Sequence, residues 1–280
     1  MGTEKNFKKY FKNVPSEQLH ILNDFRNIEY NYLGEWKYKT IGKGKPIVLL
    51  PGGFMDANMW FYLAQKIESY KLIIPDSYVR QVVFNISEAS VKIIEMIHQE
   101  GHHKAGFLGI SAGGGLLQYI LGTYPEIVDF AILSHTGVLD PDRKNQIKKT
   151  IRIASLMPEF VLRARLKKMT MQKYLESEWK NFSKAFVKHT AQYFSKKALL
   201  SWLKGSVTIL ENYKIKPWNG SMLILTSNDD KLSNEQSKRL LEQYPRAKIH
   251  TFNKGGHHTV FLYPEQYTQA IIKFLKSNNK

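Results

Sequence analysis

The sequence of 280 residues contains no cysteine. Disulfide bonds, thiolate metal sites and cysteine nucleophiles are therefore excluded. No stretch approaches the roughly 18 consecutive apolar residues that a membrane-spanning helix needs, so we expect no membrane span. Because a lack of cysteine is typical of a reducing compartment, the sequence favours a cytoplasmic protein.

Acidic residues are also scarce, since 24 Asp and Glu stand against 41 Lys and Arg and give a formal net charge of +17. The excess is concentrated in residues 141–216, which hold 18 basic and 5 acidic side chains, a net of +13. Such a balance can indicate nucleic acid, a membrane surface or an anionic ligand as partner. The basic residues are spread through an apolar segment with no recognition motif, so we expect no nucleic-acid partner.

The N-terminal region combines lysines with an aromatic stripe. Phe7, Tyr10, Phe11 and Val14 follow the i, i+3, i+4, i+7 spacing of one helix face. Two interpretations are open for this amphipathic helix. It either lies on a membrane surface or, as we favour, packs its aromatic face on the body of the protein.

Short apolar runs alternate with helix-length segments along the rest of the chain. Several runs are continuous, such as IVLL and MLILT, which is typical of strands covered on both faces of a parallel sheet. The predicted strands are Trp36–Ile41, Pro46–Leu50, Leu72–Pro75, Ala105–Gly109, Phe130–Ser134, Met222–Ser227 and Lys248–Phe252, and the predicted helices are Asn58–Ser69, Glu88–Glu100, Ala112–Thr123, Asn234–Gln243 and Pro264–Phe274. The alternation predicts the α/β class, with a doubly wound, mostly parallel sheet.

The alternation stops between Val138 and Pro217, where glycine is rare and Lys, Leu and aromatic residues are frequent. Trp179, Phe182 and Phe186 show helical spacing and are expected to form part of a local packing core. We predict three or four helices inserted between two strands. The expected division is a core of residues 1–137 and 218–280 with a helical insertion at 138–217.

The strongest local motif is Gly109-Ile110-Ser111-Ala112-Gly113, which matches G-x-S-x-G. It follows a predicted apolar strand and opens a predicted apolar helix. A serine on such a sharp strand-to-helix turn needs small residues two positions away on either side, and its hydroxyl is then exposed as a nucleophile. The motif therefore predicts nucleophilic catalysis by Ser111.

A serine nucleophile needs a base, and the base needs an acid to orient it. Asp229 and Asp230 follow one predicted strand, and His257 and His258 follow the next. Ligand sites of open α/β sheets gather at such carboxyl strand ends. The histidine pair could also bind a metal, but no third ligand stands at a convincing spacing, so we expect no metal.

Three other acidic residues and one histidine also follow predicted strands. Asp140 and Asp142 are a second candidate location for the acid. Asp76 is interpreted as a structural turn residue. His135 either lines the pocket or makes a hydrogen bond within its loop.

With these motifs, the sequence resembles the α/β-hydrolase superfamily over most of the chain outside the insertion. The matching segments are VLLPGGF, GISAGGG, SNDD and KGGHHTVFLYPEQ. The resemblance implies that Ser111 is the nucleophile and that His257, directly after two glycines, is the base. It implies Asp230 as the acid, three residues after Ser227, which stands where the family commonly has glycine.

The sequence departs from the family at Pro51, where many members have histidine. The oxyanion hole depends on backbone N–H groups, and the resemblance assigns these to Gly53 and Ala112, with Phe54 as the alternative to Gly53. The Pro-Gly-Gly variant, the ILSHTG segment and the basic insertion are similar to a maspardin-like subgroup.

The resemblance implies a serine hydrolase that cleaves an ester, a thioester or a related acyl compound through an acyl-enzyme, with the insertion as a cap. No cofactor is implied. The substrate would be a small acyl molecule, and the basic cap favours an anionic or lipid-like one. Hydrolysis of carbon–carbon bonds and perhydrolysis use the same constellation. The alternative function is a non-catalytic binding protein that uses the basic cap as an interaction surface. The sequence leaves the oligomeric state open.

Overall fold

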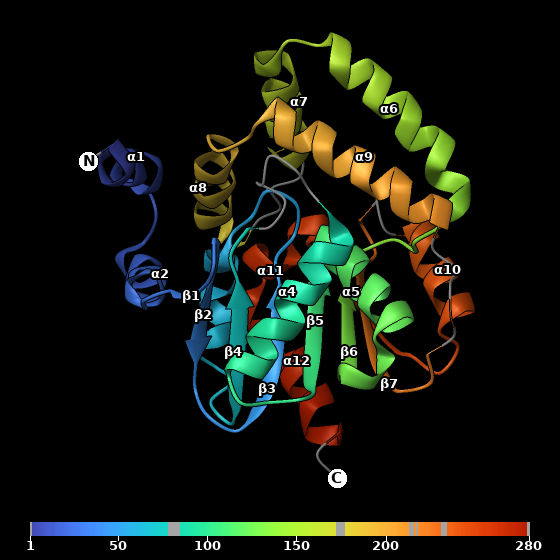
Figure 1. Cartoon of the computed structure of the whole chain (residues 1–280). Helices are drawn as coiled ribbons and strands as arrows, with labels where there is room; N and C mark the ends of the chain where they lie inside the picture. The colour runs from blue at the N-terminus through green and yellow to red at the C-terminus, as the bar shows by residue number, and fades with distance from the viewer. Residues whose placement is uncertain are drawn as a thin grey trace.

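In a computed structural model, residues 2–77, 85–171, 177–212, 216, 218–230 and 234–278 are described. Within them, eight strands form one sheet in the order β1-β2-β4-β3-β5-β6-β7-β8 (Figure 1). The strands are β1 (Asn31–Leu33), β2 (Trp36–Ile41), β3 (Lys45–Leu50), β4 (Tyr70–Pro75), β5 (Ala105–Ile110), β6 (Val128–Ser134), β7 (Ser221–Ser227) and β8 (Lys248–Phe252). Strands β3 to β8 pair in parallel, and β1 and β2 pair antiparallel at one edge. The α/β class and the mostly parallel sheet are confirmed.

Helices cover both faces of the sheet. They are α1 (Gly2–Phe11), α2 (Ser16–Asn27), α3 (Phe61–Ala64), α4 (Ile86–Gln99), α5 (Ala112–Thr123), α6 (Lys144–Leu156), α7 (Glu159–Met171), α8 (Lys180–Ala191), α9 (Lys196–Asn212), α10 (Asn234–Gln243), α11 (Thr259–Leu262) and α12 (Pro264–Asn278). On β3, Ile47 and Leu49 join a core with α2, α3 and α12, whereas Val48 and Leu50 join a second core with α4, α5 and α10. This period of two, with both faces buried, explains the continuous apolar runs.

The predicted helix Asn58–Ser69 is wrong in extent. The chain forms a short 3-10 helix, Ala57–Trp60, and then α3, which ends at Ala64. A turn follows in which Lys66 N–H donates to the Leu63 carbonyl at 3.0 Å, because the chain must reverse before β4 begins at Tyr70. Helix α2 and the short edge strand β1 are additions that the sequence pattern did not predict.

The N-terminal helix packs on the protein. Phe7 and Phe11 are buried and stack on each other with ring centroids 4.3 Å apart. Phe11 also meets Phe182 of α8 edge to face at 5.9 Å. Because the aromatic face is covered by the protein itself, the packing interpretation is confirmed and the membrane-surface interpretation of this helix is wrong.

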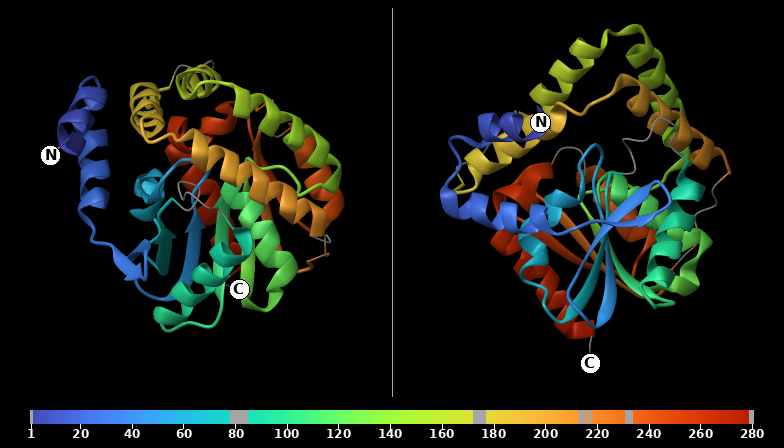
Figure 2. Two further views of the ribbon diagram at one scale, coloured as in Figure 1. Left: turned by 45° about the horizontal axis from the view of Figure 1, so that its top comes forward. Right: turned by 60° about the vertical axis from the view of Figure 1, so that its left-hand side comes forward.

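In the described part of the chain between β6 and β7 there are four α-helices, α6 to α9. Helices α6, α7 and α9 lie over the edge of the sheet at which the parallel strands end (Figures 1 and 2). Trp179, Phe182 and Phe186 are buried as expected, but they join the core that α1, α2, α3 and α12 form on one face of the sheet, so the expectation of a local core of the insertion is wrong for them. The placement of domain boundaries at residues 138 and 217 stays a prediction. Among the described residues, we find no helix that is both long and apolar enough to cross a membrane.

Candidate active site

Ser111 lies on a sharp turn between β5 and α5. Its φ of 53° and ψ of −115° place it in a region that side-chain-bearing residues rarely adopt. A Cβ atom added at Gly109 would lie 2.4 Å from the Gly113 carbonyl oxygen, and one at Gly113 would lie 2.4 Å from the Leu50 carbonyl oxygen. The two glycines are therefore required by close backbone contacts, as the motif predicts.

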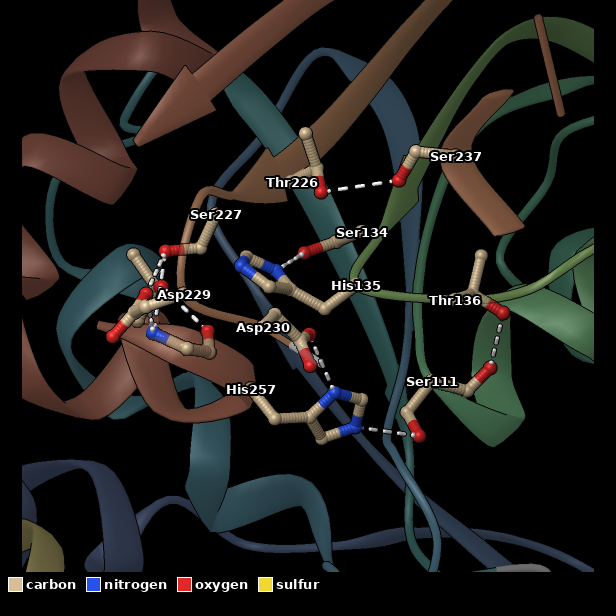
Figure 3. Close-up of polar contacts among 12 residues, drawn as sticks. Ser111, Ser134, His135, Thr136, Thr226, Ser227, Asp229, Asp230, Ser237 and His257 are labelled. Carbon is tan, nitrogen blue, oxygen red and sulfur yellow. Dashed lines mark hydrogen bonds and ion pairs between the residues drawn. The ribbon is translucent and has the colours of Figure 1, made fainter. Parts of the chain in front are cut away.

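The end of β6 holds this turn in place. Ser111 N–H donates to the Ser134 carbonyl at 2.9 Å, and the Thr136 hydroxyl donates to the Ser111 carbonyl at 2.8 Å (Figure 3). Gly114 allows the approach, since a Cβ there would come within 2.6 Å of the Thr136 side chain. Sequence reasoning did not single out Thr136. Its signal is its position two residues after the end of a strand that neighbours β5.

The structure brings Ser111, His257 and Asp230 together (Figure 3). The His257 Nε2 atom lies 3.0 Å from Ser111 Oγ, and His257 Nδ1 lies 3.0 Å from Asp230 Oδ2. Asp230 is 2% exposed. Because a carboxylate can only accept, it fixes the imidazole proton on Nδ1 and leaves Nε2 to accept the serine proton.

No family model matches the sequence. A Haemophilus influenzae protein named "Putative esterase/lipase" is 24% identical over 190 residues. The match covers 66% of this chain and 65% of the relative, slightly less than two thirds of that protein's length.

Solved structures give a fuller match. An esterase from Exiguobacterium antarcticum superposes with a TM-score of 0.70 at 17% identity and covers 89% of this chain and 99% of its own. The enol-lactonase of Burkholderia xenovorans superposes with a TM-score of 0.69 at 13% identity and covers 89% of this chain and 100% of its own. A bromoperoxidase from Bacillus anthracis superposes with a TM-score of 0.65 at 17% identity and covers 86% of this chain and 95% of its own.

This protein has the α/β-hydrolase fold. At these identities, the similarity establishes the fold and leaves the activity to the residues of the site. The maspardin-like subgroup stays a prediction.

In the α/β-hydrolase fold, the loop after β3 is expected to supply one of the two N–H groups of the oxyanion hole. Gly52 lies against the nucleophile, since a Cβ there would be 3.4 Å from Ser111 Cβ, and Gly53 has a φ of 40°. Ala112 is the first residue of α5, so its N–H is among those that the helix itself does not use. The roles of Gly53 and Ala112, and the alternative Phe54, stay predictions.

The neighbouring Asp229 does not make a hydrogen bond to His257. One of its carboxylate oxygens accepts from the Ser227 hydroxyl at 2.7 Å and from Gly256 N–H at 2.8 Å. Burial raises the pKa of Asp229, but these hydrogen bonds outweigh burial and lower the pKa below its ordinary value. Asp229 therefore fixes the loop that carries His257.

The second candidate location for the acid is not supported. Asp140 is buried, forms an ion pair with Arg239 of α10 and accepts a hydrogen bond from Asp142 N–H at 2.9 Å. Asp76 has the predicted turn role, because it accepts from Ala57 N–H at 3.2 Å and pairs with Lys37 at 3.0 Å.

Two further histidines, His135 and His258, lie next to His257. His135 is 1% exposed and has a φ of 43°, and its ring meets the His257 ring edge to face at 6.2 Å. Burial lowers the pKa of His135 to about 3 and that of His258 to about 4. Both rings are therefore neutral at pH 7, and neither adds positive charge beside His257.

Of the two interpretations of His135, the structure supports a hydrogen bond within its own loop. Its Nδ1 lies 2.9 Å from Ser134 Oγ, and the Tyr267 hydroxyl donates to that same oxygen at 2.9 Å. Its Nε2 is buried without a partner among the described residues. Within that same part of the chain, no group of three His, Asp and Glu side chains could hold a metal ion.

Proposed function

We propose that this protein is a serine hydrolase of esters, thioesters or related acyl compounds, with Ser111, His257 and Asp230 as its catalytic triad. The observation that carries the proposal is the continuous chain of two 3.0 Å hydrogen bonds from Ser111 Oγ through His257 to Asp230. These three residues sit in the roles that nucleophile, base and orienting acid require.

The reaction follows from this geometry. Ser111 Oγ attacks the acyl carbon while its proton passes to His257 Nε2, and Asp230 stabilises the imidazolium that forms. The N–H groups of Gly53 and Ala112 bind the negative oxygen of the tetrahedral intermediate. His257 then returns the proton to the leaving group. A water molecule releases the acyl group from Ser111 through the same proton transfers in the second half-reaction.

The comparisons support a hydrolytic reaction of this kind. The solved structures that match include esterases and an enol-lactonase. A lactone is a cyclic ester, so both names describe hydrolysis of a carboxylic ester bond. Acyl transfer by the triad needs no cofactor, because the serine, the imidazole and water supply every proton and bond. We propose that α6–α9 form the cap over the substrate and that the protein acts in the cytoplasm.

The alternative of a non-catalytic binding protein has no specific observation in its favour. A protein that had lost catalysis would gain nothing from the strained backbone at Ser111 or from the orientation of His257. The retained strain and hydrogen bonds therefore favour an enzyme.

A fluorophosphonate probe and Ser111→Ala test the proposal. The probe reacts with activated serines, so wild-type protein should be labelled at Ser111. The variant should lose labelling and at least about a thousandfold in hydrolysis of short p-nitrophenyl esters. Ser155→Ala, at an exposed serine of α6, is the matched control and should behave as wild type. Labelling at another serine, or unchanged turnover by Ser111→Ala, would overturn the proposal.

A further inference from the structure

The turn between α6 and α7 exposes large apolar side chains. Leu156 is 82% exposed, Phe160 74% and Ile153 43%. We call these three the apex residues. The other large hydrophobic residues exposed in the described chain, such as Tyr32 and Ile249, come from separate elements. Three such side chains lie within eight residues of the chain around one turn, and exposed apolar groups gathered in this way are typical of an interaction site.

The exposed turn is held by hydrogen bonds. Lys196 Nζ, from the start of α9, donates to the Ser155 carbonyl at 2.8 Å and to the Met157 carbonyl at 2.6 Å. Arg163 pairs with Glu159 at 2.8 Å, and Glu159 also accepts from Lys196 N–H at 3.0 Å. These contacts fix the end of α6 and the start of α7. The apex residues therefore extend into solvent from an ordered turn.

Positive charge accompanies the apex residues. Lys149, Arg152, Ile153 and Leu156 follow i, i+3, i+4, i+7 spacing and so share one face of α6, and all four are exposed. Helix α6 contains four basic residues and no acidic one. Lys144 and Lys148 reach Glu211, but Lys149 and Arg152 have no carboxylate partner in the part of the chain that the structure describes. Among the described residues, the charge of Lys149 and Arg152 is therefore not neutralised.

We propose that this face, the apex residues with Lys149 and Arg152, docks on the surface of an anionic phospholipid bilayer. The apolar side chains would enter the interface while the two cations meet lipid phosphates. The turn stands at the outer end of the α6–α9 layer, on the side of the molecule opposite the C-terminus (Figures 1 and 2). A second copy docked by the same face would bring like charges together, and a small soluble anion would leave the apolar side chains in water.

Vesicle sedimentation tests the proposal. Wild-type protein should bind vesicles that contain phosphatidylglycerol and should bind vesicles of phosphatidylcholine alone far more weakly. Leu156→Ser with Phe160→Ser should weaken binding to the anionic vesicles by at least about tenfold, since each side chain loses its apolar contact. Lys149→Gln with Arg152→Gln should weaken it by about fivefold for each cation removed.

Three controls make the result specific. Tyr32→Ser with Ile249→Ser removes exposed apolar side chains elsewhere and should bind as wild type. Thermal unfolding of the apex variants should be unchanged, because the replaced side chains face solvent. Ser111→Ala should bind vesicles fully, so docking is tested independently of the proposed hydrolysis.

The proposal is overturned if wild-type protein binds neither kind of vesicle or both kinds equally. Unchanged binding by the serine variant of Leu156 and Phe160 would also overturn it. Sedimentation velocity decides the remaining alternative: a wild-type dimer that this variant abolishes would assign the face to a second copy of the chain and exclude the bilayer as its partner.

Discussion

Polar side chains are fixed at the carboxyl edge of the sheet, whereas those of helix α6 in the insertion largely face solvent. At the edge, Ser111, His257 and Asp230 are linked by 3.0 Å hydrogen bonds, and Thr136 ties the serine to β6. On α6, which the structure describes throughout, Ala154 alone is buried. The edge thus has the preorganisation that catalysis needs, while the insertion has surface to offer to a partner.

The two regions also differ in charge. At the edge, burial keeps His135 and His258 neutral at pH 7 by lowering their pKa values. The insertion region, residues 141–216, carries +13 by sequence, much of it on exposed helix faces. Positive charge is therefore placed where water can screen it, and the two imidazoles next to His257 add none beside the buried carboxylate of Asp230. The following predictions test this contrast, from the largest expected effect to the smallest.

The first prediction separates adjacent residues at the edge. His257→Ala and Asp230→Asn should each lower kcat/KM by about a thousandfold or more. The first removes the base that accepts the serine proton, and the second removes the carboxylate that orients this base and stabilises its charged form. His258→Ala and Asp229→Asn should retain much of the activity and should chiefly lower the thermal unfolding temperature. Steady-state kinetics with a short p-nitrophenyl ester provides the measurement. The opposite ranking in either pair would place the catalytic role on the neighbour.

The edge was more predictable from sequence than the insertion, for a physical reason. Strands β3, β5 and β7 are apolar on both faces, and the turn at Ser111 needs glycine at two fixed positions, so both leave local signals. The order of serine, acid and base then indicated the pairs Asp229–Asp230 and His257–His258, from which the resemblance to the family selected Asp230 and His257. These features depend on neighbours in sequence or on a shared pattern of the fold.

Other features depend on contacts that no local pattern records. The Thr136 hydroxyl reaches a carbonyl 25 residues away, and Asp229 stabilises a loop 27 residues away. Strand β1 is short and half exposed, so it has no alternation to detect. The exposure of Leu156 was also hidden, because a leucine at helical spacing is ordinarily a packing residue.

The second prediction removes one anchor of the nucleophile. Thr136→Val keeps the side-chain shape and deletes the hydroxyl that donates to the Ser111 carbonyl. We expect kcat to fall by about tenfold with little change in KM, since a displaced serine affects the chemical step more than binding. Thr150→Val, on exposed α6, removes a hydroxyl bonded to the Gln146 carbonyl and is the matched control. Equal effects of the two variants would contradict the contrast between the regions.

The third prediction concerns pH and the buried histidine. Because the pKa of His135 is about 3 when folded and near 6.5 when unfolded, the unfolded state binds more protons between these values. Stability is then lost as pH falls below 6.5, and His135 should account for about 2 kcal/mol between pH 7 and pH 5. His135→Asn suits the positive φ and should flatten this slope in urea unfolding.

His20→Asn, on the exposed face of α2, should leave the slope of stability against pH as in wild type. An unchanged slope in His135→Asn would show that His135 becomes protonated in the folded state at mildly acidic pH. The edge would then tolerate positive charge as the insertion does.

The last and smallest effect tests whether the charge of the insertion acts on the site beneath it. If it attracts substrate, kcat/KM for a carboxylate-bearing ester should fall by about two- to fivefold from low to high salt, relative to a neutral ester of equal length. Salt shortens the Debye length from about 10 Å at 0.1 M to about 3 Å at 1 M, so attraction across the cap is lost over that range. Lys204→Glu, on α9, should reduce the difference between the esters, while Lys276→Glu, at the far end of α12, should not. If both esters respond equally to salt, the charge plays no part in substrate capture, and the basic surface then acts only on partners that touch it directly.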